Sequence, residues 1–294
     1  MSSRRAFAPA KVNLYLHVGP ARADGFHPIS SLMAFADLGD RVVAEPSEHF
    51  ELAVDGPFAR HAPLDEGNLV IRAVRALFGR FGREPPAVKL TLTKTLPAAA
   101  GLGGGSSDAA AVLLMFSGEV GLEAGDRALS ETAGGLGSDV PACLLARPVI
   151  AEGRGEVLSN VRSWPDLPVV LLRPDAGSAT GPVYAAFDAS AGKGAADTPE
   201  IPTGLASPAE AAAFLAGCRN DLEAPAVSLE PVIGKALDAL RGEPETLLAR
   251  MSGSGSACFA ICADRNAAQA LARRLAAAHP RWWVKACRLG GAAG

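Results

Sequence analysis

The stretch Leu96-Pro-Ala-Ala-Ala-Gly101-Leu-Gly103-Gly-Gly105-Ser-Ser107-Asp108 decides how the rest of this chain is interpreted. Four of the five residues from Gly101 to Gly105 are glycine, so the backbone can approach a ligand closely and adopt positive φ at little cost. Ser106 or Ser107 stands where a helix N-cap is expected, and Asp108 then falls in the first helical turn. A glycine loop before a helix N-terminus presents backbone N–H groups and the positive end of the helix dipole, which suits phosphate. The stretch therefore predicts a phosphate-binding loop, with an ordinary glycine-rich turn before a core helix as the alternative.

The loop differs from two common phosphate-binding signatures. No lysine follows the glycines where a Walker A loop requires one. A dinucleotide-binding loop follows its strand directly, whereas Pro97 and three alanines intervene here, and Ser106 stands in place of the last glycine. The sequence thus predicts a phosphate loop of another class.

Length and composition describe an ordinary globular protein. The chain has 294 residues, of which 49% are hydrophobic and 20% charged. This length allows a substantial core and favours two domains over one. The formal net charge of −3 argues against nucleic acid or an anionic membrane as the main partner.

The cysteines and the N-terminal residues indicate the compartment. The cysteines are odd in number and scattered, no nearby ligand completes a zinc site, and buried thiols in a reducing cytosol are expected. No secretory signal is visible, and no apolar run reaches the ~18 residues needed to cross a bilayer. We therefore predict a cytoplasmic protein without a membrane partner, and leave its oligomeric state open. The five cysteines are Cys143, Cys218, Cys258, Cys262 and Cys287.

A strand is predicted from Lys11 to Val18, because polar and apolar residues alternate strictly there. Its apolar face packs on a core. Its polar face begins with Lys11 and Asn13, and either faces solvent or lines a pocket.

An Asp24-Gly25 turn precedes Phe26 and His27. An aromatic face beside an imidazole can hold a flat heterocycle. Simple packing of the two rings is the alternative.

Elsewhere the pattern predicts alternating strands and helices. Asn68 is expected to cap a helix that runs to Phe81 and ends at Gly82. Residues 188–210 are rich in Ala, Gly, Ser and Pro and are interpreted as a mobile loop. The other predicted strands are 41–45 and 50–55 (a hairpin or meander), 88–93, 168–172, 257–262 and 282–289, and the other predicted helices are 126–135, 207–217, 229–241, 244–250 and 266–278.

Two further segments carry functional candidates. Asp139 precedes Val140-Pro141, where either it or Ser138 could be an ordinary helix N-cap. Met251 to Ser256 form a second Gly/Ser turn, for which a tight turn without further role is the alternative.

Five motifs, in their order along the chain, resemble those of the GHMP kinases, from about residue 7 to residue 262. The resemblance is to the branch that acts on 4-diphosphocytidyl-2-C-methyl-D-erythritol. It implies an α+β, two-domain GHMP kinase fold, with a ribosomal S5 domain 2-like N-terminal domain over residues 1–162 and a ferredoxin-like C-terminal domain over residues 163–294. The motifs are Pro9-Ala-Lys11-Val-Asn13-Leu, Ala23-Asp24-Gly25-Phe26-His27, the glycine loop, Gly137-Ser138-Asp139-Val140-Pro141 and Ser252-Gly253-Ser254-Gly255.

The resemblance also implies an activity and roles for single residues. It implies ATP-dependent phosphorylation of the C2 hydroxyl of this substrate, a step of the non-mevalonate isoprenoid pathway, with ATP and Mg²⁺ as cofactors and the metal ligands unassigned. Asp139 matches the catalytic carboxylate and Lys11 the lysine paired with it. Asn13 lies near the methylerythritol end, His27 is expected to hydrogen-bond the cytosine, and Phe26, where the family often has Tyr, is expected to stack on it. The expected ATP contacts are Asn68, near the base pocket, and Pro97, Ala98, Ala99, Ala100, Gly101, Leu102, Gly103, Gly104, Gly105, Ser106 and Ser107.

The chemistry of these residue types agrees with the resemblance. An Asp of pKa ~3.9 is a weak base for an alcohol. In a loose phosphoryl-transfer transition state the hydroxyl loses its proton late, so orientation by Asp139 counts as much as basicity. Lys11 can keep the carboxylate ionised and stabilise developing charge.

Two other classes of function remain open from the sequence. Another GHMP kinase, for homoserine, mevalonate or a sugar, would have no use for the segment from Asp24 to His27. A non-catalytic nucleotide-binding module, either a sensor or an S5-like RNA-binding domain, would have no use for Lys11 with Asp139, and the acidic balance disfavours RNA.

Overall fold

The computed structural model describes residues 3–161, 163–190 and 194–290, and its chain forms two compact units. Unit 1 comprises Met1–Ala10, Leu38–Ala98 and Gly103–Ala146, and unit 2 comprises Lys11–Asp37, Ala99–Leu102 and Arg147–Gly294. Strands β1 (Arg4–Val18) and β2 (Ile29–Pro46) contribute residues to both units, which are therefore not continuous in sequence. The division into 1–162 and 163–294 stays a prediction, and its boundary residue 162 lies outside the described residues.

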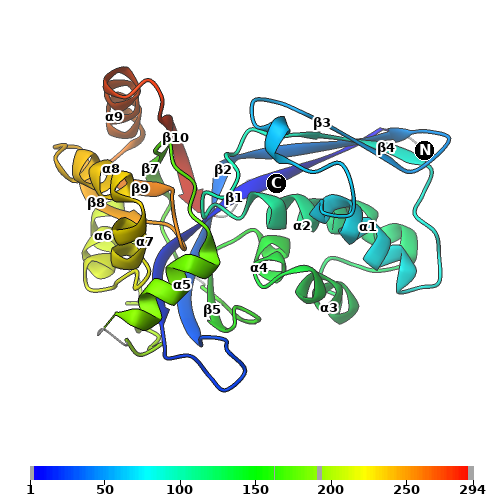
Figure 1. The fold of residues 1–294 in the computed structure, drawn as a ribbon, viewed down its shortest axis with the longest axis horizontal. Helices are drawn as coiled ribbons and strands as arrows, with labels where there is room; N and C mark the ends of the chain where they lie inside the picture. Colours follow the sequence, from blue (N-terminus) through cyan, green and yellow to red (C-terminus); the bar gives the residue numbers. More distant parts are fainter. Residues whose placement is uncertain (1–2, 162, 191–193, 291–294) are drawn as a thin grey trace. The chain divides into compact units, whose positions relative to one another are not determined.

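Unit 1 is a sheet with one face covered by helices (Figure 1). In the sheet, β4 lies between β3 and the C-terminal half of β2. Strand β4 runs antiparallel to β2, with Thr93 opposite Arg41, and parallel to β3, with Lys89 opposite Glu51. The predicted hairpin or meander of 41–45 with 50–55 is therefore wrong, because β4 from later in the chain pairs between them. The elements of unit 1 after β2 are β3 (Glu51–Asp55), η1 (Ala59–His61), α1 (Leu69–Gly79), β4 (Val88–Thr93), α2 (Gly104–Ser117), η2 (Gly118–Val120), α3 (Arg127–Leu136) and α4 (Val140–Leu145).

Helix α2 is the centre of the helical layer in unit 1. It packs against α1, α3 and α4. Most of its side chains from Ser107 to Leu113 are buried, as expected for a segment that is apolar without period. Helix α1 instead buries one stripe, which includes Val70, Val74 and Leu77, as its spacing predicts.

The start of α2 corrects one prediction. Its N-cap is Gly103, in the left-handed region at φ 63°, and Ser106 and Ser107 lie inside the helix. The glycine permits the reversal that starts the helix three residues early. Asp108 consequently falls beyond the first turn, and the Ser107 hydroxyl donates 2.5 Å to the carbonyl of Pro9 in β1.

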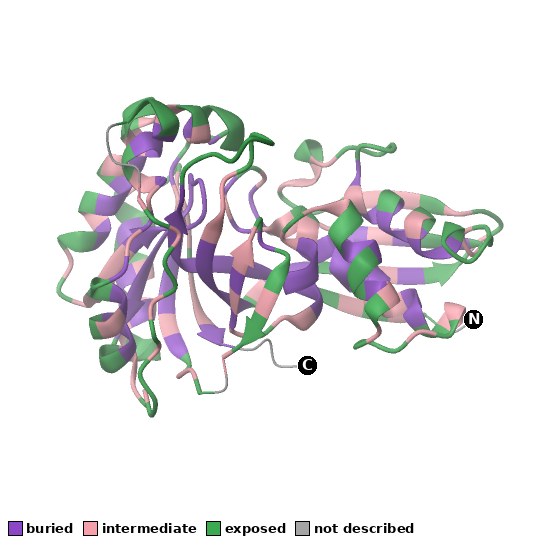
Figure 2. Cartoon of the chain, turned by 90° about the horizontal axis from the view of Figure 1, so that it is seen from below, coloured by how far each residue is buried: buried purple, intermediate pink, exposed green. Residues whose placement is uncertain are grey.

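Unit 2 is built on an antiparallel sheet in the order β2 (N-terminal half), β10, β7, β9, β8, and β5 pairs with the same half of β2. Helices α8 and α9 bury their apolar stripes, including Leu237 and Leu271, against Val170 of β7 and Ala260 of β9. Figure 2 shows buried residues along the strands and exposed ones on the outer helix faces. The elements are β5 (Val149–Gly153), β6 (Val157–Asn160), β7 (Leu167–Arg173), α5 (Thr180–Ala189), α6 (Pro208–Ala216), α7 (Glu223–Leu229), α8 (Pro231–Arg241), β8 (Thr246–Met251), β9 (Cys258–Cys262), α9 (Arg265–Ala278) and β10 (Trp283–Gly290).

Residues 246–251 form the strand β8, so the helix predicted over 244–250 is wrong. Leu, Ala, Arg and Met favour helix by propensity. Their segment instead pairs as β8 with β9, and Met251 lies opposite Cys258. Cross-strand hydrogen bonds and burial of this segment override the local preference. Helices α5 and α7 were not predicted.

The segment predicted as a mobile loop, 188–210, is partly ordered by contacts within unit 2. The carbonyl of Asp197 lies 2.7 Å from His17 Nδ1, and Thr198 Oγ1 lies 2.8 Å from Ser30 Oγ. Residues 191–193 of this segment lie outside the described residues, and its mobility stays a prediction. Among the helices of the described chain, none is long and apolar enough to cross a membrane.

Candidate active site

The glycine loop adopts backbone conformations that its sequence permits. Gly101 and Gly103 have φ values of 72° and 63°, in the left-handed region, and Ala99 joins them at 49°. A Cβ at Gly101 would lie 2.4 Å from the carbonyl oxygen of Ser252 and 3.0 Å from that of Gly255. Gly101 is thus required twice, for its φ and for the close approach of another backbone.

Three hydrogen bonds within unit 2 hold the centre of the loop. The Lys11 N–H donates 2.8 Å to the carbonyl of Leu102, and the Ala257 N–H donates 2.9 Å to that of Ala100. The Ser252 hydroxyl donates 2.9 Å to the carbonyl of Gly101. The Gly/Ser turn at 251–256 therefore braces the loop. This turn was predicted from the sequence but its partner was not, because contact between the two turns depends on the fold.

The polar face of β1 is buried in unit 2, which excludes its exposure to solvent. Lys11 is 4% exposed, Asn13 3% and His17 1%. The Lys11 ammonium donates 2.8 Å to Asn13 Oδ1, and the Asn13 amide donates 2.8 Å to Ser31 Oγ. The backbone N–H of Asn13 also donates a hydrogen bond of 3.1 Å to Ser252 Oγ. One network thus connects the β1 lysine to the turn that braces the glycine loop.

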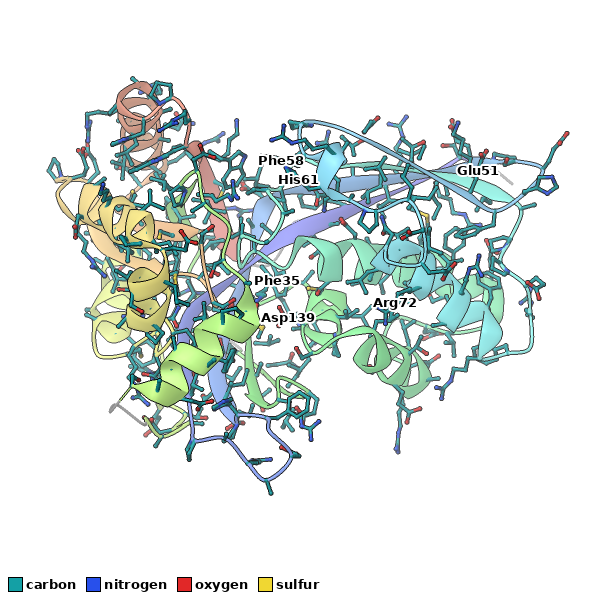
Figure 3. The ribbon with its side chains drawn as sticks, in the orientation of Figure 1. Phe35, Glu51, Phe58, His61, Arg72 and Asp139 are labelled. Atoms are coloured by element: carbon teal, nitrogen blue, oxygen red, sulfur yellow. The ribbon has the colours of Figure 1, made fainter. Side chains whose placement is uncertain are left out.

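Asp139 stands at the N-cap position of α4, but its side chain makes no capping hydrogen bond. Its backbone is in the right-handed helical region, at φ −84° and ψ −18°. Figure 3 shows its side chain at the start of this helix. Asp139 therefore occupies the cap position that the alternative predicted, but its carboxylate does not make the capping hydrogen bond. Asp139 belongs to unit 1 and Lys11 to unit 2, so their pairing stays a prediction.

Phe26 and His27 have different surroundings within unit 2. Phe26 is 53% exposed, and the guanidinium of Arg154 covers one face of its ring at 4.0 Å from the ring centre. Arg154 is held in turn by Asp24 at 2.5 Å. One face of the Phe26 ring is thus occupied by a cation, which leaves stacking of a heterocycle to the opposite face.

His27 is held from both ring nitrogens. Its Nδ1 lies 2.9 Å from the carbonyl oxygen of Gly19, and its Nε2 lies 3.4 Å from Asp188 Oδ2. The Tyr184 and Phe187 rings lie at 5.0 and 5.7 Å from the imidazole centre. Helix α5 therefore orients His27, and this helix was not predicted from the sequence.

Asn68 caps α1, as predicted. Its Oδ1 accepts the Val70 N–H at 2.9 Å, and its amide donates 2.7 Å to the carbonyl of Pro63. Both ends of the side chain thus serve the local turn. Contact of Asn68 with a nucleotide base stays a prediction.

Unit 1 contains a buried charged cluster that was not predicted from the sequence. Asp40, Lys94 and Asp108 form two ion pairs, with the Lys94 ammonium between the two carboxylates. Their positions in the sequence carry only a weak signal: Asp108 follows the glycine loop inside an apolar run, where a charge needs a buried partner.

No group of three His, Cys, Asp or Glu side chains suited to a metal occurs in the described ranges 3–161, 163–190 and 194–290. Mg²⁺ in kinases is held by one or two carboxylates together with substrate phosphates, not by a protein cage.

Comparison with known proteins identifies the class. The model of the GHMP kinases N-terminal domain matches residues 68–147, and that of the GHMP kinases C-terminal domain matches residues 204–281. The crystal structure of homoserine kinase from Cytophaga hutchinsonii, 18% identical, superposes with a TM-score of 0.70 over 99% of this chain and 96% of that chain. The chain belongs to the GHMP kinases and has their two-domain, mixed α/β fold. It is an ATP-dependent small-molecule kinase.

Nearer relatives narrow this to one branch of the family. The chain is 53% identical over 287 residues to the 4-diphosphocytidyl-2-C-methyl-D-erythritol kinase of Caulobacter sp. strain K31, covering 97% of this chain and 98% of the relative. A crystal structure of 4-(cytidine 5'-diphospho)-2C-methyl-D-erythritol kinase is 36% identical, with a TM-score of 0.78 over 98% of this chain and all of that chain. Within the GHMP kinases, the resemblance found in the five motifs is therefore confirmed.

Proposed function

We propose that this chain transfers the γ-phosphoryl group of ATP to the C2 hydroxyl of 4-diphosphocytidyl-2-C-methyl-D-erythritol, a step of the non-mevalonate isoprenoid pathway. The observation that carries the proposal is the hydrogen bonding between β1 and the glycine loop. The backbone of Lys11 bonds to Leu102, and its ammonium lies in the polar network of Asn13. A cation is thereby fixed beside the loop that is proposed to hold the triphosphate.

The glycine loop and α2 supply the proposed phosphate site. The first N–H groups of a helix have no acceptor within the helix, and they lie at the positive end of its dipole. From Gly103 to Gly105, no side chain beyond Cα separates the backbone from a ligand. The residues from Pro97 to Ser107 are therefore proposed to bind ATP, chiefly through the backbone.

The proposed chemical step rests on Asp139 and Lys11. Asp139 orients the acceptor hydroxyl and accepts its proton late in the transfer. Lys11 stabilises the carboxylate and the negative charge that develops between the acceptor and the transferred group. Bound Mg²⁺ neutralises part of the triphosphate charge.

Asn13, Phe26 and His27 are proposed to select the acceptor. Asn13 holds Lys11 by a hydrogen bond and is placed toward the methylerythritol end. The Gly19 carbonyl holds His27 Nδ1, and Nε2, which lies 3.4 Å from Asp188 Oδ2, is proposed to hydrogen-bond the cytosine. The predicted cytoplasmic location belongs to the same proposal.

A panel of acceptors tests the proposed function. Purified protein is incubated with ATP and Mg²⁺ and one of 4-diphosphocytidyl-2-C-methyl-D-erythritol, homoserine or mevalonate, and the phosphorylated product is followed by ³¹P NMR. We expect kcat/KM for the cytidine-bearing acceptor to exceed the others by at least about 10⁴-fold, because a site built to hydrogen-bond a substrate group rejects analogues that lack it. Equal or faster turnover of homoserine or mevalonate would contradict the proposal.

Phe26→Ala tests the stacking role. Loss of one base–aromatic stack of about 1–3 kcal/mol is expected to raise KM for the cytidine-bearing acceptor roughly 5- to 150-fold. KM for ATP and kcat are expected to stay near their original values. The control is Phe7→Ala, which removes a partly exposed ring in unit 1, whereas Phe26 lies in unit 2. An acceptor KM that is the same in both variants would remove Phe26 from acceptor binding.

A further inference from the structure

A buried charged cluster lies under the first turn of α2. Asp40 is fully buried, Lys94 is 7% exposed and Asp108 3%. The Lys94 ammonium donates 2.6 Å to Asp108 Oδ2 and also bonds Asp40 Oδ2. A Cβ placed on Gly104, the first residue of α2, would lie 3.4 Å from Lys94 Nζ and 3.5 Å from Asp40 Oδ2. The cluster thus contacts the N-terminus of the helix from the protein side.

The same cluster fixes the entry to the glycine loop. Asp40 Oδ1 accepts the N–H groups of Thr95 at 2.6 Å and Leu96 at 2.9 Å. The other oxygen of Asp40 bonds Lys94, which in turn bonds Asp108 in the second turn of α2. The residues just before the loop and the helix just after it are therefore held by one set of hydrogen bonds.

The charged groups of the cluster are costly to bury, and they shift the pKa values of Lys94 and Asp108. Burial raises the pKa of Asp108 to about 7, against the effect of Lys94, and Asp40 adds to the increase. Burial lowers the pKa of Lys94, but Asp108 and Asp40 outweigh it, so that the ammonium keeps its charge. Asp108 Oδ1 is buried and accepts no hydrogen bond from the described residues. Apolar residues of similar volume commonly give equal or greater stability than such a cluster. Stability therefore does not explain the cluster, and we look for its role in the hydrogen bonds that it makes.

We propose that Asp40, Lys94 and Asp108 act together as positioning residues, which hold the loop entry and the first turn of α2 in the geometry that binds the triphosphate of ATP. This inference rests on the proposed function, because the proposed function assigns ATP as the ligand of the loop. The cluster bonds the backbone just before the loop and the helix just after it. It therefore affects ATP binding by positioning the backbone of the loop. Rigid placement is effective because a backbone displaced by about 1 Å can reduce a rate or an affinity by ~100-fold.

Two variants separate positioning from stability. Asp108→Asn keeps the shape and an oxygen that accepts from Lys94, but removes the charge of the carboxylate. Lys94→Met combined with Asp108→Asn removes the ammonium and leaves Asp40 with its two backbone donors, so that only one buried carboxylate loses its cation. Phe78→Leu is the matched control, because Phe78 packs on Phe116 at the other end of α2, with ring centres 6.1 Å apart.

The measurements are KM for ATP, KM for the cytidine-bearing acceptor, kcat, the melting temperature, and the affinity for a non-hydrolysable ATP analogue by calorimetry. We expect KM for ATP and the analogue Kd to rise about tenfold in the single variant and about 100-fold in the double variant. The acceptor KM is expected to change less than twofold. Phe78→Leu is expected to lower the melting temperature and leave ATP binding unchanged.

Three outcomes decide the inference. An ATP-specific loss in the cluster variants at a melting temperature equal to or above that of Phe78→Leu supports it. An ATP KM and analogue Kd within twofold of the original, or equal losses for ATP and acceptor, would overturn it. If the original protein does not phosphorylate the cytidine-bearing acceptor, the proposed function fails, while the analogue affinities still decide the positioning role.

Discussion

Asp139→Asn is expected to lower kcat by about 10²- to 10⁴-fold, the contribution typical of a positioned acid or base. Asparagine keeps the shape of the side chain but loses the negative charge that orients the acceptor hydroxyl and receives its proton. KM for ATP is expected to stay within about threefold, because the proposed triphosphate contacts come from the glycine loop. Steady-state kinetics with the cytidine-bearing acceptor measures both.

Stability distinguishes this loss from a folding defect. Asp139→Asn keeps the shape of the side chain and breaks no capping hydrogen bond of α4, and urea unfolding of the variant measures how much of any lost turnover reflects a lower free energy of unfolding. Asp126→Asn is the matched control, since Asp126 holds the N-cap position of α3. Turnover of Asp139→Asn within threefold of the original, or a loss shared by Asp126→Asn, would remove Asp139 from the mechanism.

Gly101→Ala is expected to produce a large loss of stability from one added methyl group. The position has φ 72°, and the new Cβ would lie 2.4 Å from the Ser252 carbonyl oxygen, so backbone must shift against backbone. A strained left-handed residue alone costs about 1–3 kcal/mol, and the overlap adds to this. We therefore expect at least about 3 kcal/mol of destabilisation in urea unfolding, together with a raised KM for ATP in any protein that remains folded.

Gly134→Ala is the control for this substitution. Gly134 lies inside α3, and a Cβ there would meet no atom of the described residues within 4 Å apart from its chain neighbours and the backbone of its own helix. Alanine in a helix interior is expected to stabilise by about 0.5–1 kcal/mol relative to glycine. Equal free energies of unfolding for the two variants would show that the turn at 251–256 does not restrict the loop.

Much of the fold could be predicted from local patterns. The alternation at 88–93 and the 3.6-residue stripe of α1 each report which face is buried, and both are confirmed. The glycine loop was located correctly, but the helix after it begins at Gly104 and not at the serines. The position of a helix cap depends on where the backbone reverses direction. Gly103 allowed this reversal three residues before Ser106, where a serine cap was expected.

The candidate site was predicted mainly through resemblance, because its residues are distant in sequence. Lys11, Asn13 and the glycine loop were proposed together, and contacts within unit 2 connect them through Ser252, which lies 239 residues from Asn13 in the sequence. The orientation of His27 by α5 and the cluster of Asp40, Lys94 and Asp108 were missed. Periodicity reports the face of a residue but not which distant residue meets it.

The amino-acid order alone established the position of the glycine loop and the buried and exposed faces of most helices and strands, because interactions between neighbours a few residues apart are recorded in local spacing. Its five motifs indicated a kinase family by resemblance, and phosphate binding by the loop stays a proposal. Folding in three dimensions determined that 246–251 is a strand, that the polar face of β1 is enclosed, and that one ammonium joins two carboxylates beneath α2. Each of these depends on hydrogen-bond partners or burial supplied from elsewhere in the chain, and such long-range contacts outweigh the preferences of a short segment.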